Sequence, residues 1–204
     1  MTLHMMEKDD ILNLDYYSRY ICNNDITVTF IPTPIFHQMV ENNYLMFKGL
    51  KYIYVGGDVL VPKYTNIMYE KLPKVKVYNA YGPAEITVIC CAQLIEKIYT
   101  SDIPLGKVVS NNNVYILDKC QNVCPINCPG ELYVSGDGLG MGYINRDDLT
   151  KEKFIFPKDI NELTYRSGDL TLWNSLGEVR YISRIDSQLK IRGQRVEILE
   201  IQNR

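Results

Sequence analysis

Two short stretches of the first half of the chain carry residue types that could bind a flat ring and a cation. The stretch NAYGPAE at residues 79–85 places an amide, an aromatic ring, a Gly-Pro turn and a carboxylate close together. Asn79 could hydrogen-bond the edge of a base, Tyr81 could stack on its face, and Glu85 could hold Mg²⁺ beside phosphate oxygens. Spacing alone leaves two interpretations open, a ligand site and a tight turn that simply reverses the chain.

The second stretch, VGGD at residues 55–58, also ends a strand-like segment. In open α/β sheets, ligands bind beyond the carboxyl ends of the strands. Gly56, Gly57 and Gly82 would let a ligand approach the backbone closely because they carry no side chain. The two strand ends are therefore candidate walls of one site.

The second half of the chain supplies a carboxylate and a cation. In YRSGDL, Asp169 follows a glycine and could accept two hydrogen bonds from ribose hydroxyls, although an ordinary turn aspartate is the better explanation of this stretch taken alone. In EVRYISRIDSQLKIRGQRVEILEI, Arg184 could neutralise a phosphate. A solvated strand face explains Lys190 and Arg195 better than a functional role does.

The elements that must position these residues alternate in type up to about residue 107. Strands are expected at residues 26–32, 50–58, 74–82 and 86–95, because these runs are rich in β-branched and aromatic residues. Helices are expected at residues 9–25, 33–43 and 62–73, with Thr33 as a possible N-cap and Pro34 at the first helical position. This alternation predicts a largely parallel α/β sheet.

The pattern of predicted elements changes after about residue 107. Strand-like pieces at residues 112–118, 130–136, 163–173, 177–183 and 188–193 are separated by Gly, Asn, Asp and Pro, with one helix expected at 147–154. This spacing predicts a small β-barrel. The predicted organisation is part of an α/β subdomain over 1–107, a β-barrel-like subdomain over 108–185, and a hinge with the start of a truncated C-terminal domain over 186–204.

Composition excludes several functional classes. The 204 residues are 46% hydrophobic and 23% charged, with a net charge of -2 and no basic block, so no nucleic-acid partner is expected. The apolar runs are too short for a membrane helix and the N-terminus is not a secretory signal, so we expect a cytoplasmic protein. The six cysteines include Cys90 and Cys91, expected as buried thiols, and three at residues 120, 124 and 128 that lack the spacing of a zinc site.

Four stretches, taken in order, resemble one known family. They are NAYGPAE, GELYVSGDGLGMGYINRDDLTKEKF, YRSGDL and SRIDSQLKIRGQRVEILEI. Together they resemble the adenylate-forming superfamily, which includes acyl-CoA synthetases and luciferases. They are most similar to the amino-acid adenylation domains of nonribosomal peptide synthetases, over essentially the whole chain.

The resemblance implies a role for each matching residue. Tyr81 and Asn79 would hold adenine, Asp169 would bind the ribose hydroxyls, and Glu85 would help bind Mg²⁺. Arg184 would act with Glu85 in catalysis, and Asp186 would be the hinge between a large and a small domain. The implied nucleotide-binding positions are Gly56, Gly57, Asp58, Asn79, Ala80, Tyr81, Gly82, Ala84, Asp169 and Tyr181.

The resemblance also implies the reaction and the partners. The family uses ATP and Mg²⁺ to convert an acid into an acyl-adenylate and pyrophosphate, and then passes the acyl group to the phosphopantetheine thiol of a carrier protein. Here the substrate would be an amino acid and the partner a peptidyl carrier protein. An apolar or small substrate side chain is expected, because the implied pocket positions are Phe30, Ile53, Val55, Ala80, Val88 and Ile89.

Departures from the family pattern keep other hypotheses open. No Ser/Thr/Gly-rich phosphate loop, substrate-binding acidic motif or catalytic lysine is found in the chain, so we expect a partial adenylation domain that is inactive alone. Ala84 lacks the hydroxyl that usually contacts phosphate, a loss of about 1.5 to 3 kcal/mol, Asp58 replaces Glu and Met141 replaces Arg. The alternatives are part of a standalone fatty, aryl or D-alanyl ligase, and a non-catalytic nucleotide-binding remnant.

Overall fold

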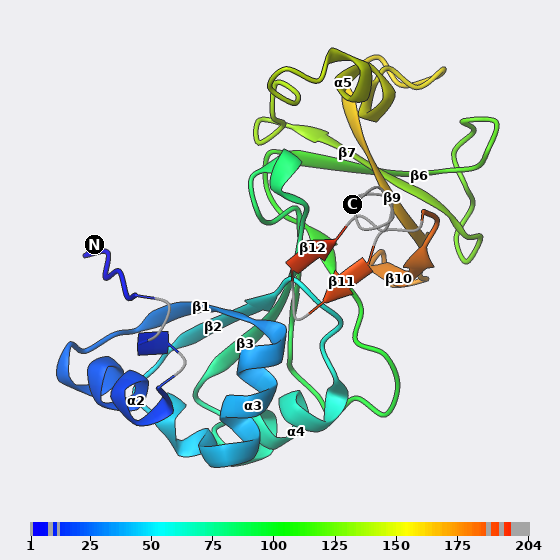
Figure 1. Cartoon of the computed structure of the whole chain (residues 1–204). Helices are drawn as coiled ribbons and strands as arrows, with labels where there is room; N and C mark the ends of the chain where they lie inside the picture. Colours follow the sequence, from blue (N-terminus) through cyan, green and yellow to red (C-terminus); the bar gives the residue numbers. More distant parts are fainter. Residues whose placement is uncertain (1, 8–9, 12, 187–188, 192–193, 197–204) are drawn as a thin grey trace. The chain divides into compact units, whose positions relative to one another are not determined.

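The computed structural model describes residues 2–7, 10–11, 13–186, 189–191 and 194–196 (Figure 1). The chain folds into two compact units, Met1–Tyr78 with Leu94–Asp102, and Asn79–Gln93 with Ile103–Arg204. The NAYGPAE turn therefore belongs to the same unit as the β-rich second half of the chain. The domain boundaries proposed from the sequence stay predictions.

The first unit builds its core between strands and helices. β1 (Val28–Pro32) and β2 (Tyr52–Gly56) pair in parallel, with Val28 opposite Tyr52 and Pro32 opposite Gly56. The helices are α2 (Leu14–Asn23), α3 (Thr33–Asn43) and α4 (Pro62–Lys71), with a 3₁₀ turn η1 at Tyr44–Phe47. Figure 1 shows these helices together on one side of the strands. The alternation predicted for this part of the chain is confirmed.

The helix starts follow their local sequence. The side chain of Asn13 caps α2 by accepting the N–H of Tyr16 at 3.1 Å. α3 begins at Thr33, directly after β1, with Pro34 in its first turn. The expected capping role of Thr33 is wrong, because Thr33 lies inside the helix and its hydroxyl donates to the Asp58 carbonyl at 3.2 Å. This bond ties the start of α3 to the chain after β2.

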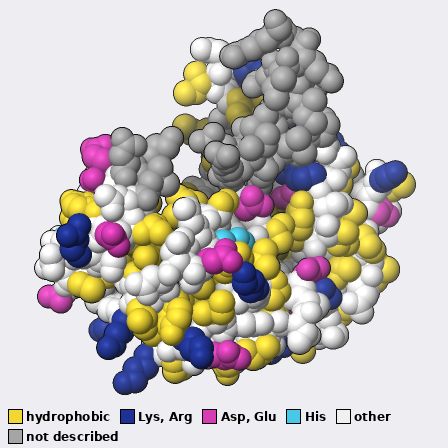
Figure 2. Space-filling model, turned by 60° about the horizontal axis from the view of Figure 1, so that its bottom comes forward, with side chains coloured by type: hydrophobic (Ala, Val, Ile, Leu, Met, Phe, Trp, Pro, Cys, Tyr) yellow, Lys and Arg dark blue, Asp and Glu magenta, His cyan; other side chains and the backbone are white. Residues whose placement is uncertain are grey.

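The helix-covered side of the molecule mixes apolar and charged side chains. Figure 2 shows this side, with hydrophobic side chains interspersed among Lys, Arg, Asp and Glu. Beneath the surface, Phe36 and Met39 of α3 and Met68 of α4 are fully buried, as are Ile53 and Val55 of β2. Apolar burial of this kind stabilises the unit by roughly 25 cal/mol for each Å² removed from water.

The first sheet has the strand order β1-β2-β3-β4-β5, with β3 at Lys76–Tyr81, β4 at Cys91–Leu94 and β5 at Lys107–Val108. The strand expected at residues 86–95 is wrong in its first half. Ala84–Ile86 instead form a 3₁₀ turn, η2, and Thr87 and Val88 have φ angles of 55° and 71°. Left-handed residues cannot continue a strand, so β4 begins only at Cys91. It then pairs antiparallel with β5, which makes the sheet mixed rather than purely parallel.

The second sheet forms a curled antiparallel half-barrel with the order β10-β9-β7-β6, and β8 pairs with β9. Its strands are β6 (Asn112–Leu117), β7 (Gly130–Gly136), β8 (Phe154–Ile155), β9 (Thr164–Trp173) and β10 (Val179–Arg184). Helix α5 (Asp147–Lys153) precedes β8, as predicted. Leu132, Val134 and Val179 form a buried cluster with both Cys90 and Cys91, which are buried free thiols.

The end of the chain is only partly described. β11 (Leu189–Ile191) and β12 (Gln194–Val196) pair antiparallel. The remainder of the element expected over residues 192–204 lies outside the described residues, and so do the side chains of Lys190 and Arg195. None of the helices in the described ranges combines the length and the apolar character that a membrane span requires.

Candidate functional site

The second unit brings Tyr81 and Asp169 together, although 88 residues separate them. Tyr81 ends β3, and its hydroxyl donates to Oδ2 of Asp169 in the middle of β9. Asp169 is 4% exposed. A buried carboxylate needs hydrogen-bond or charge partners, and the Tyr81 phenol is one of them.

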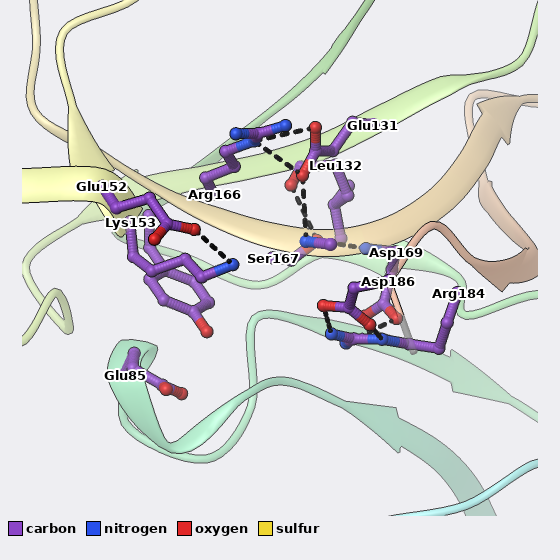
Figure 3. Close-up of polar contacts among 12 residues, drawn as sticks. Glu85, Glu131, Leu132, Glu152, Lys153, Arg166, Ser167, Asp169, Arg184 and Asp186 are labelled. Carbon is purple, nitrogen blue, oxygen red and sulfur yellow. Dashed lines mark hydrogen bonds and ion pairs between the residues drawn. The ribbon is translucent and has the colours of Figure 1, made fainter. Parts of the chain in front are cut away.

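Arg184 supplies the opposing charge. It lies opposite Asp169 in the β9–β10 ladder, and its Nη1 is 3.0 Å from Asp169 Oδ1. Its Nε and Nη2 atoms grip Asp186 at 2.9 and 2.5 Å, which is the two-pronged geometry of a strong guanidinium–carboxylate pair. Figure 3 shows these three side chains meeting beside β9, with Glu85 on its separate turn. The predicted ribose, phosphate and hinge residues therefore form one connected cluster.

The position of Asp169 is set by an irregularity in β9. The β7–β9 register shifts between Glu131 and Tyr133, as in a β-bulge. At this point Gly168 has a φ of +75°, and its N–H donates to Glu131 Oε1 at 3.2 Å. The hydroxyl of Ser167 accepts the N–H of Asp169 at 3.1 Å. These bonds fix the backbone that carries the carboxylate.

The electrostatics of the cluster keep its groups in defined states. Burial, followed by the neighbouring Asp169 carboxylate, raises the pKa of Tyr81 well above its usual range, so the phenol stays neutral and donates. Burial alone would lower the pKa of the Arg184 guanidinium, but the hydrogen bond to Asp186 and the charge of Asp169 raise it overall. The site thus holds a permanent cation between two carboxylates.

Glu85 lies in the η2 turn that follows β3. Its Oε1 accepts a hydrogen bond from the Tyr143 hydroxyl at 2.5 Å, and its carbonyl accepts the N–H of Gly140 at 2.8 Å. Tyr143 is a site residue that sequence reasoning missed. The signal that could have found it is the GMGY segment at residues 140–143, within the second family-like stretch.

The other predicted nucleotide positions of this unit lie on β3, in the turn that follows it and on β10. Asn79 is buried, and its side-chain amide donates to the Pro104 carbonyl at 2.8 Å, so one donor is already used. Gly82 is required by packing, because a Cβ there would lie 2.6 Å from the Val88 carbonyl. Ala84 is exposed, and half-buried Tyr181 packs against the buried cluster of the second sheet.

Three predicted nucleotide positions belong to the first unit. Gly56 ends β2, and Gly57 follows with a φ of +93°, a conformation that favours glycine. The Asp58 carboxylate accepts the N–H of Val59 at 2.7 Å, which closes the turn. A Cβ at Gly57 would have no atom within 4 Å, so this turn is open around its second glycine.

The predicted pocket residues do not gather on one surface of the first unit. Ile53 and Val55 are fully buried, whereas Phe30 is 48% exposed. Phe30 is opposite Tyr54 in the ladder, so it points to the other face of the sheet from Ile53 and Val55. In the second unit Ala80 is buried, Val88 is 57% exposed, and Ile89 lies between them in exposure.

The possible metal ligands around Glu85 suit a cation that is coordinated mainly by a bound substrate. In the described residues, no group of three or more His, Cys, Asp or Glu is placed to hold a metal ion by itself. Mg²⁺ is usually bound through one or two carboxylates with phosphates and water completing its shell. A single oriented carboxylate therefore fits Mg²⁺ that arrives with a nucleotide, and Glu85 is the residue that would hold it.

The chain is similar to known proteins in both sequence and fold. Residues 1–144 match the family model described as AMP-binding enzyme. The chain is 41% identical to gramicidin S synthase 2 of Brevibacillus brevis, over 98% of this chain and 4% of that protein. It is 40% identical to tyrocidine synthase 3 of Brevibacillus parabrevis, over 98% and 3%. The chain thus spans only a small fraction of these relatives.

The fold comparison points the same way. A holo NRPS protein containing adenylation and PCP domains, bound to a vinylsulfonamide inhibitor, matches with a TM-score of 0.87 and 26% identity. The match covers 93% of this chain and 34% of that chain.

Proposed function

The chain belongs to the AMP-binding enzyme family, and from this membership we propose that it is the nucleotide-binding part of an adenylation domain that activates an amino acid with ATP. Its similarity to gramicidin S and tyrocidine synthases supports a place in nonribosomal peptide synthesis. The observation that carries the proposal is the convergence of Tyr81 with Asp169 and Arg184, two residues of adjacent strands that lie far from Tyr81 in the sequence.

The geometry suggests how these residues would bind ATP. Each carboxylate oxygen can accept two hydrogen bonds, so Asp169 can take ribose hydroxyls while Tyr81 and Arg184 hold it in place. The Tyr81 ring would face adenine, with Asn79 at the base edge. Tyr181 is proposed to cover the other face of the base.

The proposed reaction needs positioning and charge neutralisation more than proton transfer. A carboxylate oxygen of the amino acid attacks the α-phosphorus of ATP, the bond to the departing pyrophosphate breaks, and aminoacyl-AMP forms. The Arg184 guanidinium would offset the negative charge that develops on the phosphate oxygens. Mg²⁺ held by Glu85 would supply further charge neutralisation when it is bound.

The second half of the reaction would involve a carrier protein. The solved NRPS protein of similar fold contains adenylation and PCP domains, which supports transfer of the aminoacyl group to a phosphopantetheine thiol on such a partner. Asp186 is proposed as the hinge between a large and a small domain, about which the small domain would rotate between the two steps. The free cysteines of the structure fit a cytoplasmic protein.

The substrate is proposed to carry an apolar or small side chain. This rests on the residue types at Phe30, Ile53, Val55, Ala80, Val88 and Ile89. Neither a strong hydrogen-bond donor nor a charged group occurs among the side chains at these six positions. A polar group on the substrate side chain would therefore find no side-chain partner there.

The binding part of the proposal can be tested on the 204-residue chain with AMP as the probe. Asp169→Asn keeps the size of the side chain but removes the charge that grips ribose and pairs with Arg184. Loss of a charged hydrogen bond costs about 1.5 to 3 kcal/mol, so calorimetry should show AMP affinity reduced by about tenfold or more. Glu162→Gln is the matched control, because Glu162 accepts bonds from Ser135 and Asn113 in the same unit but lies apart from the cluster. Equal AMP affinity in the Asp169 variant and the wild type would refute the ribose assignment.

A second candidate is nucleotide binding without turnover by this chain. It is favoured by Ala84, whose exposed methyl group offers no hydroxyl that could donate to a phosphate. We expect the 204-residue chain to bind AMP but to show no ATP–pyrophosphate exchange. Measurable exchange by the purified chain would contradict this second candidate.

A further inference from the structure

A contact between Tyr143 and Glu85 lies in the same unit as Tyr81, Asp169 and Arg184 and has no role in the reaction described above. The Tyr143 hydroxyl donates to Oε1 of Glu85 at 2.5 Å, across 58 residues of sequence. We propose that Tyr143 is a positioning residue, which orients the Glu85 carboxylate for a divalent cation. This inference rests on the proposed function, in which Glu85 binds Mg²⁺.

Tyr143 is itself held in place from several sides. Its N–H donates to Thr150 Oγ1 at 2.8 Å, and its ring packs edge-on against Phe154 at a centroid distance of 5.8 Å. Its hydroxyl lies 3.5 Å from that of Tyr165. Gly142 allows this packing, because a Cβ there would lie 2.4 Å from Cγ2 of Thr150. The phenol therefore reaches Glu85 from a fixed ring.

The same loop also holds the backbone of the Glu85 turn. The N–H of Gly140 donates to the Glu85 carbonyl at 2.8 Å, and the hydroxyl of Thr87 donates to the Gly138 carbonyl at 2.7 Å. The approach is close, since a Cβ at Gly138 would lie 3.0 Å from the Ile86 carbonyl. Residues 138–143 thus restrain both the main chain and the side chain of Glu85.

This arrangement matters for a cation because a carboxylate binds metal best when its direction is already fixed. An O–H donor to an ionised carboxylate makes a short, strong bond, and the oxygen that accepts it retains another lone pair for metal. Loss of a residue that orients a metal ligand typically lowers metal affinity by about 10- to 100-fold. A neutral phenol can do this without adding a charge that repels the cation.

The test uses Mn²⁺ as the probe, because its free concentration can be followed by electron paramagnetic resonance. The full chain is titrated with Mn²⁺ in the presence of a non-hydrolysable ATP analogue, so the readout is binding and not turnover. We expect Tyr143→Phe to weaken Mn²⁺ binding by about tenfold or more while AMP binding without metal stays unchanged. Thr150→Val, which removes the acceptor of the Tyr143 N–H, should give a smaller loss in the same direction.

Tyr115→Phe is the matched control. The Tyr115 hydroxyl also donates to a carboxylate, that of Glu162, in the same unit. Tyr115→Phe should therefore match the stability loss of Tyr143→Phe, as measured by thermal unfolding, but leave Mn²⁺ binding unchanged. Equal loss of Mn²⁺ binding in both variants would reduce the Tyr143 contact to a structural one.

Glu85→Gln separates failure of the inference from failure of the proposed function. If Glu85→Gln weakens Mn²⁺ binding and neither Tyr143→Phe nor Thr150→Val does, Glu85 remains the cation ligand and the positioning role is wrong. If the wild type binds no Mn²⁺, or Glu85→Gln binds it as well as the wild type, the cation role of Glu85 is overturned and the inference falls with it.

Discussion

At the level of single residues, the cluster depends on how closely the guanidinium and carboxylate groups approach the main chain at Gly168. A Cβ built there would lie 2.6 Å from Asp186 Oδ2 and 2.8 Å from Arg184 Nη2. The N–H of Ile185 also donates to the Gly168 carbonyl at 2.8 Å, so the backbone of the two strands is pinned at this point. A glycine is therefore needed both for its φ of +75° and for the space it leaves.

We predict that Gly168→Ala destabilises the chain by at least about 2 kcal/mol, because left-handed backbone strain adds to displacement of the Arg184–Asp186 pair. The matched control is Gly177→Ala, since Gly177 has a φ of +69° but a Cβ there would have nothing within 4 Å. That change should cost only the strain, about 1 to 2 kcal/mol. Urea denaturation measures both, and AMP affinity should fall for Gly168→Ala alone. Equal losses of unfolding free energy in the two variants would show that the close contact at Gly168 adds nothing to the cost of the substitution.

Asp169, Tyr81 and Glu85 could be identified from the sequence as candidate ligand-binding residues because each stands near a glycine or proline, but their short stretches alone also fit plain turns. Their partners could not be predicted. Whether Arg184 meets Asp169 depends on the β9–β10 register, which is shifted between Tyr181 and Ser183. A one-residue shift reverses the direction of every side chain beyond it, and no local pattern in the chain reports such a shift.

At the level of elements, the spacing of apolar residues and the positions of turn-forming residues predicted most strands and the helices of the first unit. The failure at residues 86–95 has a tertiary cause. The run ITVICC is rich in β-branched residues, but the chain turns back at Gly82, and the N–H of Cys90 then bonds the Tyr81 carbonyl at 2.8 Å. The turn forces Thr87 and Val88 into left-handed conformations, which overrides their preference for strands.

The α3–α4 contact also produces a pH-sensitive element. His37 of α3 stacks on Tyr64 of α4 at a ring-centroid distance of 4.3 Å, and its Nε2 lies 3.3 Å from the Val61 nitrogen. Burial lowers the pKa of His37, and the charges of Asp58 and Glu41 only partly oppose this effect. The neutral ring is the form that can accept the Val61 N–H, so the folded chain disfavours protonation.

We predict that the free energy of unfolding falls as pH drops below about 6.5, the ordinary pKa of histidine. In that window the unfolded chain binds a proton at His37 and the folded chain does not, so stability rises with pH. Urea denaturation at about pH 7.5 and about pH 5.5 measures this slope, and His37→Gln should flatten it. Carboxylates titrate at lower pH, so their contribution falls outside this window. An equal slope in the His37 variant would assign the pH dependence to another group.

At the level of the whole molecule, the first sheet has an open edge. β1 stands at one end of the strand order, and within the described residues no strand pairs with its side away from β2. Val28 is 50% exposed and Phe30 is 48% exposed on this strand. An exposed edge strand with apolar side chains is a template for pairing with another chain.

We therefore predict that the 204-residue chain self-associates through β1. Val28→Lys places a charge on the edge strand and should lower the concentration-dependent rise in average mass, which sedimentation velocity measures, because a lysine must be desolvated before another strand can pair there. Val59→Lys is the matched control, since Val59 is 57% exposed but lies in the loop after β2. If both substitutions reduce association equally, net charge and not the β1 edge governs it. If neither does, the contact lies elsewhere on the chain.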